Sequence, residues 1–217
     1  MTTIREQSDQ MKVAAAAQLP ADILAVFDRS IQEFVDTGIP YGAIAVGDEL
    51  GAFTLDDATD TRVSLDRIIE DGPAVIVFYR GGWCPYCNLA LRTYQEELLP
   101  RLDEFNARLV AISPQSPDES LSTAEKAGLE FTVLSDPGAR VAQRIGIAFQ
   151  QADDVIAAQA ALGLDLAAVN AEGATRLPRP TVLVVDRDRI VRFVDVQPDY
   201  TARTEVADII AALQNLG

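Results

Sequence analysis

The sequence predicts an α/β fold with a central mixed β-sheet, helices on both faces and a helical extension at the N-terminus. Short apolar runs rich in β-branched and aromatic residues alternate with helical segments, which is typical of parallel strands covered on both faces. Two later runs, 181–185 and 190–196, flank a turn at Arg187-Asp188 and predict an antiparallel hairpin. Strand-like runs begin only after residue 44, so we assign residues 1–44 to the N-terminal helical extension and 45–217 to the main domain.

The extension contains two predicted helices. The first covers 11–18. The second starts at Pro20 and ends before Gly38 and Pro40. Its apolar residues recur at helical spacing: Ile23, Phe27, Ile31, Phe34 and Val35. We expect this stripe to pack on the main domain, with a partner surface as the alternative, and 41–49 to connect the two parts.

Other elements follow in order along the main domain. We expect a hairpin of 53–55 with 61–65, a central strand at 74–79, and further strands at 109–112 and 131–134. We expect helices at 85–106, 117–127, 139–145 and 201–213, the last with Val206, Ile209, Ile210 and Leu213 on one side. The Ala-rich segment 150–175 fits an inserted helix plus loop.

Composition narrows the function. Hydrophobic residues make up 48% and charged residues 24%, as in ordinary globular proteins. The net charge of −15 disfavours binding to nucleic acid or to a membrane surface. No apolar run is long enough for a membrane span, and the polar first ten residues do not resemble a signal peptide. We therefore expect a cytoplasmic protein.

The chain contains no histidine and only two cysteines, Cys84 and Cys87. The lack of histidine excludes Ser-His-Asp and Cys-His hydrolases and any histidine-ligated metal centre. A zinc site would need two further ligands of the cysteine or histidine type, so we expect neither a metal nor another cofactor. A C-x-x-C pair in such a chain indicates redox chemistry more than a structural disulfide or two inert thiols.

The cysteine motif joins the predicted central strand to a helix. Gly81 and Gly82 allow a turn, and Pro85 suits the first helical turn. Cys84 then lies near the N-cap and Cys87 in the first turn, where free N–H groups and the helix dipole stabilise a thiolate. Such placement lowers a cysteine pKa from about 8.5 to about 7 or below. The i, i+3 spacing puts both sulfur atoms on one face, so a disulfide can close between them.

Several neighbours have two interpretations. Arg80 either holds its guanidinium near the thiolate or faces solvent at the strand end. Trp83, beside Tyr86 in the motif, either shields the sulfur and forms a docking surface or belongs to the core. A proline in the 177–181 segment would be able to form a cis bond whose backbone flanks the cysteines.

An ordered set of four segments, 47–55, 77–87, 134–138 and 180–186, resembles the peroxiredoxin-like branch of the alkyl hydroperoxide reductase/thiol-specific antioxidant (AhpC/TSA) family. The resemblance covers roughly 45 to 213 and implies a thioredoxin-like fold. The C-x-x-C motif alone is shared with thioredoxins and glutaredoxins, whereas the ordered set is much more specific.

Two superpositions of motifs follow from the resemblance. On a peroxiredoxin, Cys87 falls on the peroxide-attacking cysteine, Cys84 on the motif threonine and Arg80 on its proline. The family's arginine before the late strand falls on Pro180, and Arg179 is adjacent. On thioredoxin, Cys84 is the attacking thiol, Cys87 resolves, and Pro180-Thr181 match the cis-proline turn. Thioredoxin's buried aspartate falls on Phe78.

These superpositions imply two activities. In a thiol-dependent peroxidase, Cys87 forms a sulfenic acid, Cys84 condenses with it, and Arg80 with Arg179 stabilises the charges. In a general thiol-disulfide oxidoreductase, Cys84 attacks a disulfide and Cys87 resolves it. A peroxide or disulfide substrate and an external thioredoxin- or glutathione-type reductant are then the expected partners. A third hypothesis is a redox sensor or binding protein with little turnover. The helical extension at 11–36 and the inserted segment 150–175 would then be its binding surfaces, and a homodimer would form through either of them.

Overall fold

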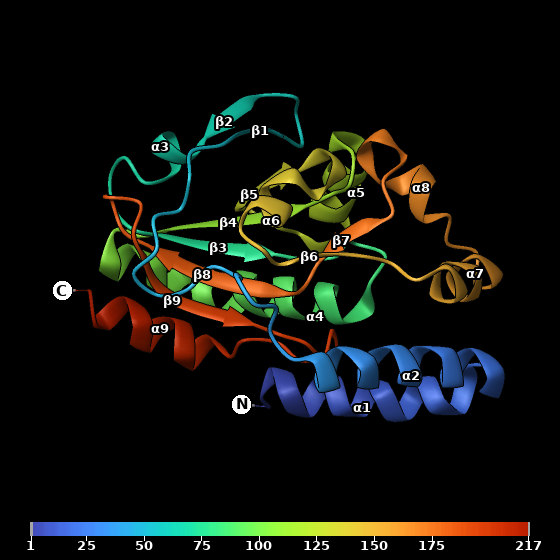
Figure 1. Ribbon diagram of the computed structural model, residues 1–217. Coiled ribbons are helices and arrows are strands. Elements are labelled where there is room, and N and C mark those ends of the chain that lie inside the picture. The colour runs from blue at the N-terminus through green and yellow to red at the C-terminus, as the bar shows by residue number, and fades with distance from the viewer. Residues whose placement is uncertain (1, 217) are drawn as a thin grey trace.

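The computed structural model describes residues 2–216, the side chains of residues 126 and 127 aside, and is built on one large mixed sheet (Figure 1). Its strand order is β2-β1-β5-β4-β3-β8-β9. The strands are β1 (Thr54–Asp57), β2 (Arg62–Ser64), β3 (Ala74–Phe78), β4 (Arg108–Ser113), β5 (Thr132–Ser135), β8 (Thr181–Val185) and β9 (Val191–Val196). Strands β3, β4 and β5 are parallel, while β8 pairs antiparallel with β3 and with β9. The predicted mixed sheet and both hairpins are confirmed.

Side chains of β3 alternate between two cores. Ile76 and Phe78 enter one core, which α3 (Leu65–Ile68) and α6 (Arg140–Arg144) cover. Val75 and Val77 enter the other, under α4 (Pro85–Thr93) and α9 (Val206–Gln214). All five residues of β3 are buried, because the strand lies in the middle of the sheet with helices on both faces (Figure 1). The central-strand prediction is confirmed.

The remaining helices are α1 (Ile4–Gln18), α2 (Ala21–Thr37), α5 (Pro117–Ala127), α7 (Asp153–Ala161) and α8 (Leu166–Val169). Helix α1 begins seven residues before the predicted start at Met11. Thr3 and Glu6 form a capping box there, in which each side chain accepts a hydrogen bond from the other residue's backbone N–H. The predicted start was too late because it followed the alanine-rich run instead of the cap.

The single helix predicted over 85–106 is wrong beyond Thr93. A π-helical turn at Tyr94–Leu98 and a 3-10 segment at Leu99–Phe105 replace its second half. Pro100 lies in this segment, and a proline can neither donate a backbone hydrogen bond nor fit the regular α-helical turn before it.

The C-terminal helix begins at Val206, and the predicted start at Thr201 is wrong. Residues 199–205 instead form a loop that turns at Asp199, whose carboxylate accepts hydrogen bonds from the backbone N–H and the hydroxyl of Thr201, 2.8 and 2.6 Å long. Glu205 is the N-cap of α9. We call residues 199–205 the arginine loop, because it carries Arg203.

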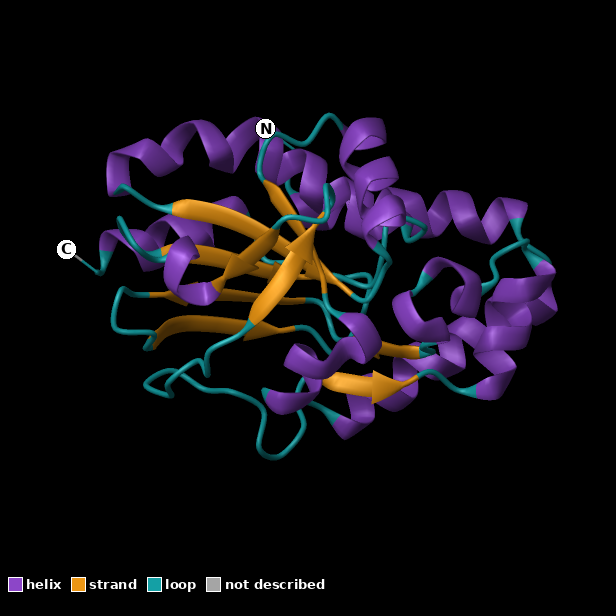
Figure 2. Cartoon of the chain, turned by 90° about the horizontal axis from the view of Figure 1, so that it is seen from above, coloured by secondary structure: helices purple, strands orange, loops and turns teal. Residues whose placement is uncertain are grey.

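The inserted segment contains the expected helical structure in α7 and α8. It is also bounded by a small antiparallel sheet that was not predicted, β6 (Ala148–Gln150) with β7 (Arg176–Pro178), which lies apart from the large sheet (Figure 2). Helix α2 packs on α7, and Phe34 meets Phe149 edge to face with ring centroids 4.6 Å apart. The expected packing of the apolar stripe on the main domain is confirmed for Phe34, whereas Val35 remains 47% exposed.

None of the helices found in residues 2–216 has the combined length and apolarity that crossing a bilayer requires.

Candidate active site

The turn between β3 and α4 depends on two glycines. Gly81 has φ +149°, and a Cβ atom there would lie 2.3 Å from Trp83 Nε1. A Cβ atom on Gly82 would lie 2.1 Å from Thr123 Oγ1. The backbone can therefore turn toward the cysteines only because both positions lack a side chain.

Cys84 is the N-cap of α4, and Pro85 occupies the first turn, as predicted. The Cys84 carbonyl accepts hydrogen bonds from the backbone N–H groups of Cys87 and Asn88, at 3.0 and 3.1 Å, which starts the helix. Both cysteines are free thiols, and they are 1% and 0% exposed. The motif therefore presents a reduced, buried dithiol at a helix N-terminus.

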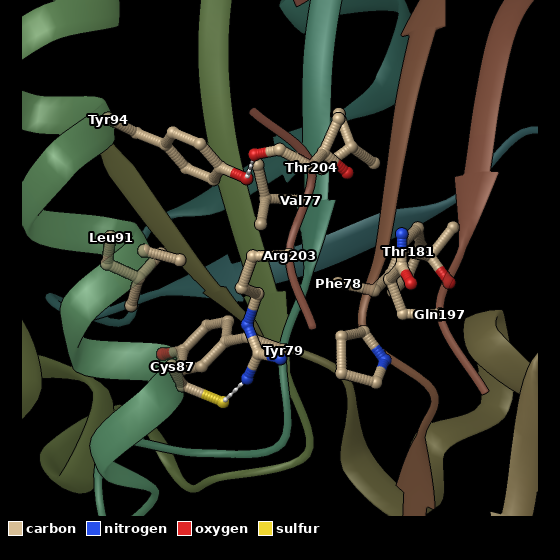
Figure 3. A pocket seen from close by; sticks show the side chains of 13 residues that line it. Val77, Phe78, Tyr79, Cys87, Leu91, Tyr94, Thr181, Gln197, Arg203 and Thr204 are labelled. Atoms are coloured by element: carbon tan, nitrogen blue, oxygen red, sulfur yellow. Dashed lines mark hydrogen bonds between the residues drawn. The ribbon is translucent and has the colours of Figure 1, made fainter. Parts of the chain in front are cut away.

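Arg203 contacts the sulfur of Cys87. Its Nη2 atom donates a hydrogen bond to Cys87 Sγ over 3.1 Å, as the dashed line in Figure 3 marks. The second terminal nitrogen of the guanidinium, Nη1, donates to the carbonyl oxygens of Tyr200 and Ala202 within the arginine loop. The Tyr94 hydroxyl in turn donates to the Thr204 carbonyl over 2.7 Å. The guanidinium is thus oriented by its own loop and directed at the thiol.

The two cysteines have opposite pKa shifts. Burial alone would raise the pKa of Cys87, but a hydrogen bond from the Cys84 thiol and the positive charges of Arg203 and Arg80 hold it well below its usual range. Donating that hydrogen bond to Cys87, together with burial, raises the pKa of Cys84 well above its usual range. Of the two thiols, Cys87 is therefore the one that ionises more readily, and Cys84 is the one that keeps its proton.

Arg80 is buried, with 3% of its surface exposed, so the solvent-facing alternative is wrong. Its guanidinium carbon lies 4.1 Å from the ring centroid of Tyr200 and 5.0 Å from that of Trp83, and its Nη2 donates to Gln151 Oε1 over 3.3 Å. Half-buried Trp83 packs against this cation. Arg80 lowers the pKa of Cys87, as predicted, but to a smaller extent than Arg203.

Arg179 does not face the thiol, and the expectation that it stabilises the thiolate beside Arg80 is corrected. Its guanidinium lies over Phe34 at 5.0 Å and near Phe149 at 5.7 Å. The side chain is 6% exposed, and burial lowers its pKa. Arg179 therefore packs against Phe34 of α2 and against Phe149, and it helps to hold α2 on the main domain.

Pro180 and Thr181 line a small cavity beside Cys87, so the expected approach of this segment to the cysteines is confirmed. The cis-proline expectation is wrong, because every peptide bond of the described chain is trans. The cavity, also lined by Gln197 and Arg203, measures about 10 Å³, the space of a single water molecule. Tyr86 is half-buried, its ring centroid 6.2 Å from that of Tyr200.

Sequence reasoning missed Arg203 and Tyr200. Arg203 was absorbed into the predicted C-terminal helix of 201–213, and Tyr200 directly precedes that helix, although Asp199 and Thr201 form a turn-favouring pair that signals a loop. As for metals, residues 2–216 bring together no group of three side chains of the His, Cys, Asp or Glu type.

The sheet order and the dithiol at the start of α4 define a thioredoxin-fold protein. A peroxidoxin, BcpB from Mycobacterium tuberculosis, shares this fold with a TM-score of 0.64 and 24% identity over 80% of this chain and 99% of its own. A peroxiredoxin-like protein from Aquifex aeolicus has a TM-score of 0.64 and 15% sequence identity, and the match covers 82% of this chain and 91% of that protein.

The family follows from the sequence comparison. The AhpC/TSA family model matches residues 46–194, which is more than half of the chain, so the protein belongs to the AhpC/TSA family. A Haemophilus influenzae protein named as a peroxiredoxin, bcp, is 33% identical over 48% of this chain and 66% of its own length. Chloroplastic peroxiredoxin Q of Triticum aestivum is 27% identical over 59% of this chain and 58% of its own length. The chain thus spans 66% and 58% of the lengths of these two relatives, less than two thirds of each.

Proposed function

We propose that the protein is a thiol peroxidase in which Cys87 attacks the peroxide and Cys84 resolves the product. One observation carries this assignment: Arg203 donates a hydrogen bond to Cys87 Sγ, and the pKa of Cys87 is lowered while that of Cys84 is raised. The nucleophile of thiol chemistry is the thiolate. A thioredoxin-type reaction would need the charge on Cys84, whereas the opposite pKa shifts favour ionisation of Cys87.

The proposed reaction balances with the groups at the site. The Cys87 thiolate attacks one peroxide oxygen, the O–O bond breaks, and Cys87 becomes a sulfenic acid. The leaving alkoxide or hydroxide takes the proton of the neighbouring Cys84 thiol and departs as alcohol or water. The new Cys84 thiolate then attacks the Cys87 sulfur, which forms the disulfide and releases hydroxide. An external dithiol or glutathione system reduces the disulfide and restores both thiols.

Arg203 and Arg80 have separable roles in this proposal. Arg203 contacts the sulfur directly, so it stabilises the thiolate and then the oxygen anion that leaves. Arg80, whose guanidinium stacks on Trp83 and Tyr200, acts through its charge and through a backbone hydrogen bond to Cys87. Cys87 is 0% exposed, so the side chains around it must move before a peroxide can reach its sulfur.

The relatives' names support the proposal, because those proteins are called peroxiredoxins. The superposition implied by the family resemblance also places Cys87 on the attacking cysteine. Both observations agree with the electrostatics of the site.

The test uses the reduced protein with hydrogen peroxide or an organic hydroperoxide, in wild type, Cys84→Ser and Cys87→Ser. We expect a sulfenic acid, trapped by a dimedone-type reagent and located by mass spectrometry, to persist on Cys87 in Cys84→Ser. Wild type should instead accumulate the Cys84–Cys87 disulfide. No sulfenic acid should form in Cys87→Ser. Sulfenic acid formation on Cys84, or none in any variant, would refute the assignment.

General thiol-disulfide exchange is the second candidate, favoured by Pro180 and Thr181 beside Cys87, where the resemblance to thioredoxin places a substrate-facing turn. Insulin reduction distinguishes the two. The peroxidase predicts fast peroxide consumption with slow insulin reduction. Brisk insulin reduction that Cys84→Ser abolishes, combined with sluggish reaction with peroxide, would instead establish the oxidoreductase.

A further inference from the structure

Helix α1 contacts the arginine loop through a hydrogen bond and an ion pair along its first three turns. Ser8 Oγ donates a hydrogen bond to the Thr201 carbonyl over 2.6 Å, and the Lys12 ammonium lies 3.5 Å from the Asp199 carboxylate. The bond from Ser8 is buried, with the serine only 3% exposed, whereas the lysine contact is at the surface. The two contacts reach the loop on either side of Tyr200.

The start of α1 rests on the far end of the same loop. The backbone N–H groups of Ile4 and Arg5 donate to the two carboxylate oxygens of Glu205, over 3.1 and 2.9 Å. These groups belong to the first turn, whose N–H groups have no partner inside the helix, and a carboxylate also suits the positive end of the helix dipole. Ile4 itself is 1% exposed and packs in the core that contains both cysteines.

The loop also has contacts that do not involve α1: the Tyr200 ring lies 6.2 Å from that of Tyr86 on α4 and 4.1 Å from the Arg80 guanidinium. Thr204 is held by the Tyr94 hydroxyl and by the Asp195 carboxylate, at one end of the loop. Inside the loop, Arg203 Nη1 donates to nearby carbonyls, and the Ala202 N–H donates to the Asp199 carbonyl. Such internal bonds shape the loop but do not place it relative to α4. Helix α1 contacts α4 directly and therefore adds a further link between the loop and the helix of the cysteines, beside the contact of Tyr86 with Tyr200.

We propose that α1 is a positioning element of the thiol site, in which Ser8 and Glu205 hold the arginine loop so that the Arg203 guanidinium stays on the Cys87 sulfur. Neither residue contacts the thiol, so both act through Arg203. The inference deepens the proposed function, since it assigns a catalytic contribution to the N-terminal extension.

Among the described residues, Arg203 is the charged group at Cys87 that the loop itself carries, and Arg80 stacks on the loop's Tyr200. The charged or titratable groups around the sulfur are Cys84 and Arg80 from the β3–α4 turn, Tyr79 from the end of β3, and Arg203. Tyr94, on the helical segment after α4, faces the guanidinium of Arg203. A displaced arginine loop therefore removes the hydrogen bond from Arg203 and takes Tyr200 away from Arg80, while Cys84 and Tyr79 remain in place. The expected consequence is a higher Cys87 pKa.

The experiment titrates Cys87 in the full chain, in a Cys84→Ser background so that one thiol is observed. The rate of alkylation by iodoacetamide is measured against pH. We expect Ser8→Ala to reduce the alkylation rate near neutral pH by about threefold to tenfold, the scale of one lost hydrogen bond. Glu205→Gln, which keeps the side-chain shape but removes the charge, should shift the titration in the same direction.

Coupling to Arg203 separates this role from a general loss of stability. Added to Arg203→Met, the Ser8→Ala change should have a much smaller effect on the titration than it has when Arg203 is present. The matched control is Thr93→Val, which removes a similar hydroxyl–carbonyl bond of 3.0 Å from a residue 8% exposed and should leave the titration unchanged.

Equal effects of Ser8→Ala with and without Arg203, or no effect in either, would overturn the inference. The readout is independent of peroxide. If the coupling is found but no sulfenic acid forms with peroxide, the proposed function fails and the positioning role stands. If sulfenic acid forms without the coupling, the reverse holds.

Discussion

Arg203 and Cys87 are 116 residues apart in the chain, yet the Arg203 guanidinium donates a 3.1 Å hydrogen bond to the Cys87 sulfur. The resemblance to peroxiredoxins places an arginine at the start of the late strand, where this chain has Pro180. Its neighbour Arg179 is directed at Phe34 and Phe149. The cation at the thiol therefore comes from the loop between β9 and the last helix, and not from the segment before β8.

Replacing Arg203 tests this contact. A hydrogen bond to a charged group contributes about 1.5–3 kcal/mol, so Arg203→Met should raise the Cys87 pKa by about one to two units and slow alkylation at neutral pH roughly tenfold to a hundredfold. Arg203→Lys should lose less, because it keeps the charge but not the planar guanidinium. A titration of Arg203→Met that superimposes on wild type would show that the contact is not energetically important.

Cys84 is the second donor to the Cys87 thiolate, and its contribution can be isolated by two substitutions. Cys84→Ala removes the donor and should raise the Cys87 pKa, whereas Cys84→Ser retains a hydroxyl that can donate and should change it less. The measurement is thiolate absorbance against pH under reducing conditions. Equal shifts in both variants would mean that the Cys87 pKa rises because packing is lost, and not because the hydrogen bond is lost.

The two pKa shifts also predict how the dithiol contributes to stability as pH changes. The folded pKa of Cys87 lies below that of an unfolded thiol, about 8.5, so its contribution is complete above that value and is lost as pH falls through the folded pKa. Cys84 has the opposite shift, so its contribution is present below about 8.5 and is lost as pH rises toward the folded pKa.

Urea unfolding of reduced wild type and Cys87→Ala at several pH values measures this dependence. The stability lost in Cys87→Ala should increase as the pH rises toward about 8.5. The peroxide reaction should follow the same ionisation, because only the thiolate attacks. A cost of Cys87→Ala that does not depend on pH would contradict the lowered pKa.

The local features of the site could be predicted from the sequence, whereas its long-range contacts could not. Glycines, proline and the C-x-x-C spacing fix a turn and a helix start, so the placement of Cys84 and Cys87 was correct. Arg203 was missed because the apolar spacing from Val206 onward looked continuous with Thr201 and concealed a loop. The direction of Arg179 depends on Phe34 of α2, and nothing near either residue in the sequence indicates that they meet.

The contact between Phe34 and Arg179 leads to a prediction on stability. Phe34 packs against Phe149 and beneath the buried guanidinium of Arg179, so Phe34→Ala removes an aromatic pair and a cation–π partner together. We expect a loss of about 2 kcal/mol in the free energy of unfolding. Val35→Ala is the matched control: Val35 is the next residue on the same helix but is 47% exposed, so its loss should be small.

The Phe34→Ala variant also separates the two halves of the extension. Because α1, and not α2, is fastened to the arginine loop, Phe34→Ala should leave the Cys87 titration unchanged while it lowers stability. Urea unfolding and the alkylation titration of the same preparations measure both quantities. Equal losses of stability in Phe34→Ala and Val35→Ala would show that the aromatic contacts do not anchor α2, and a shifted Cys87 titration would show that α2 also acts on the thiol.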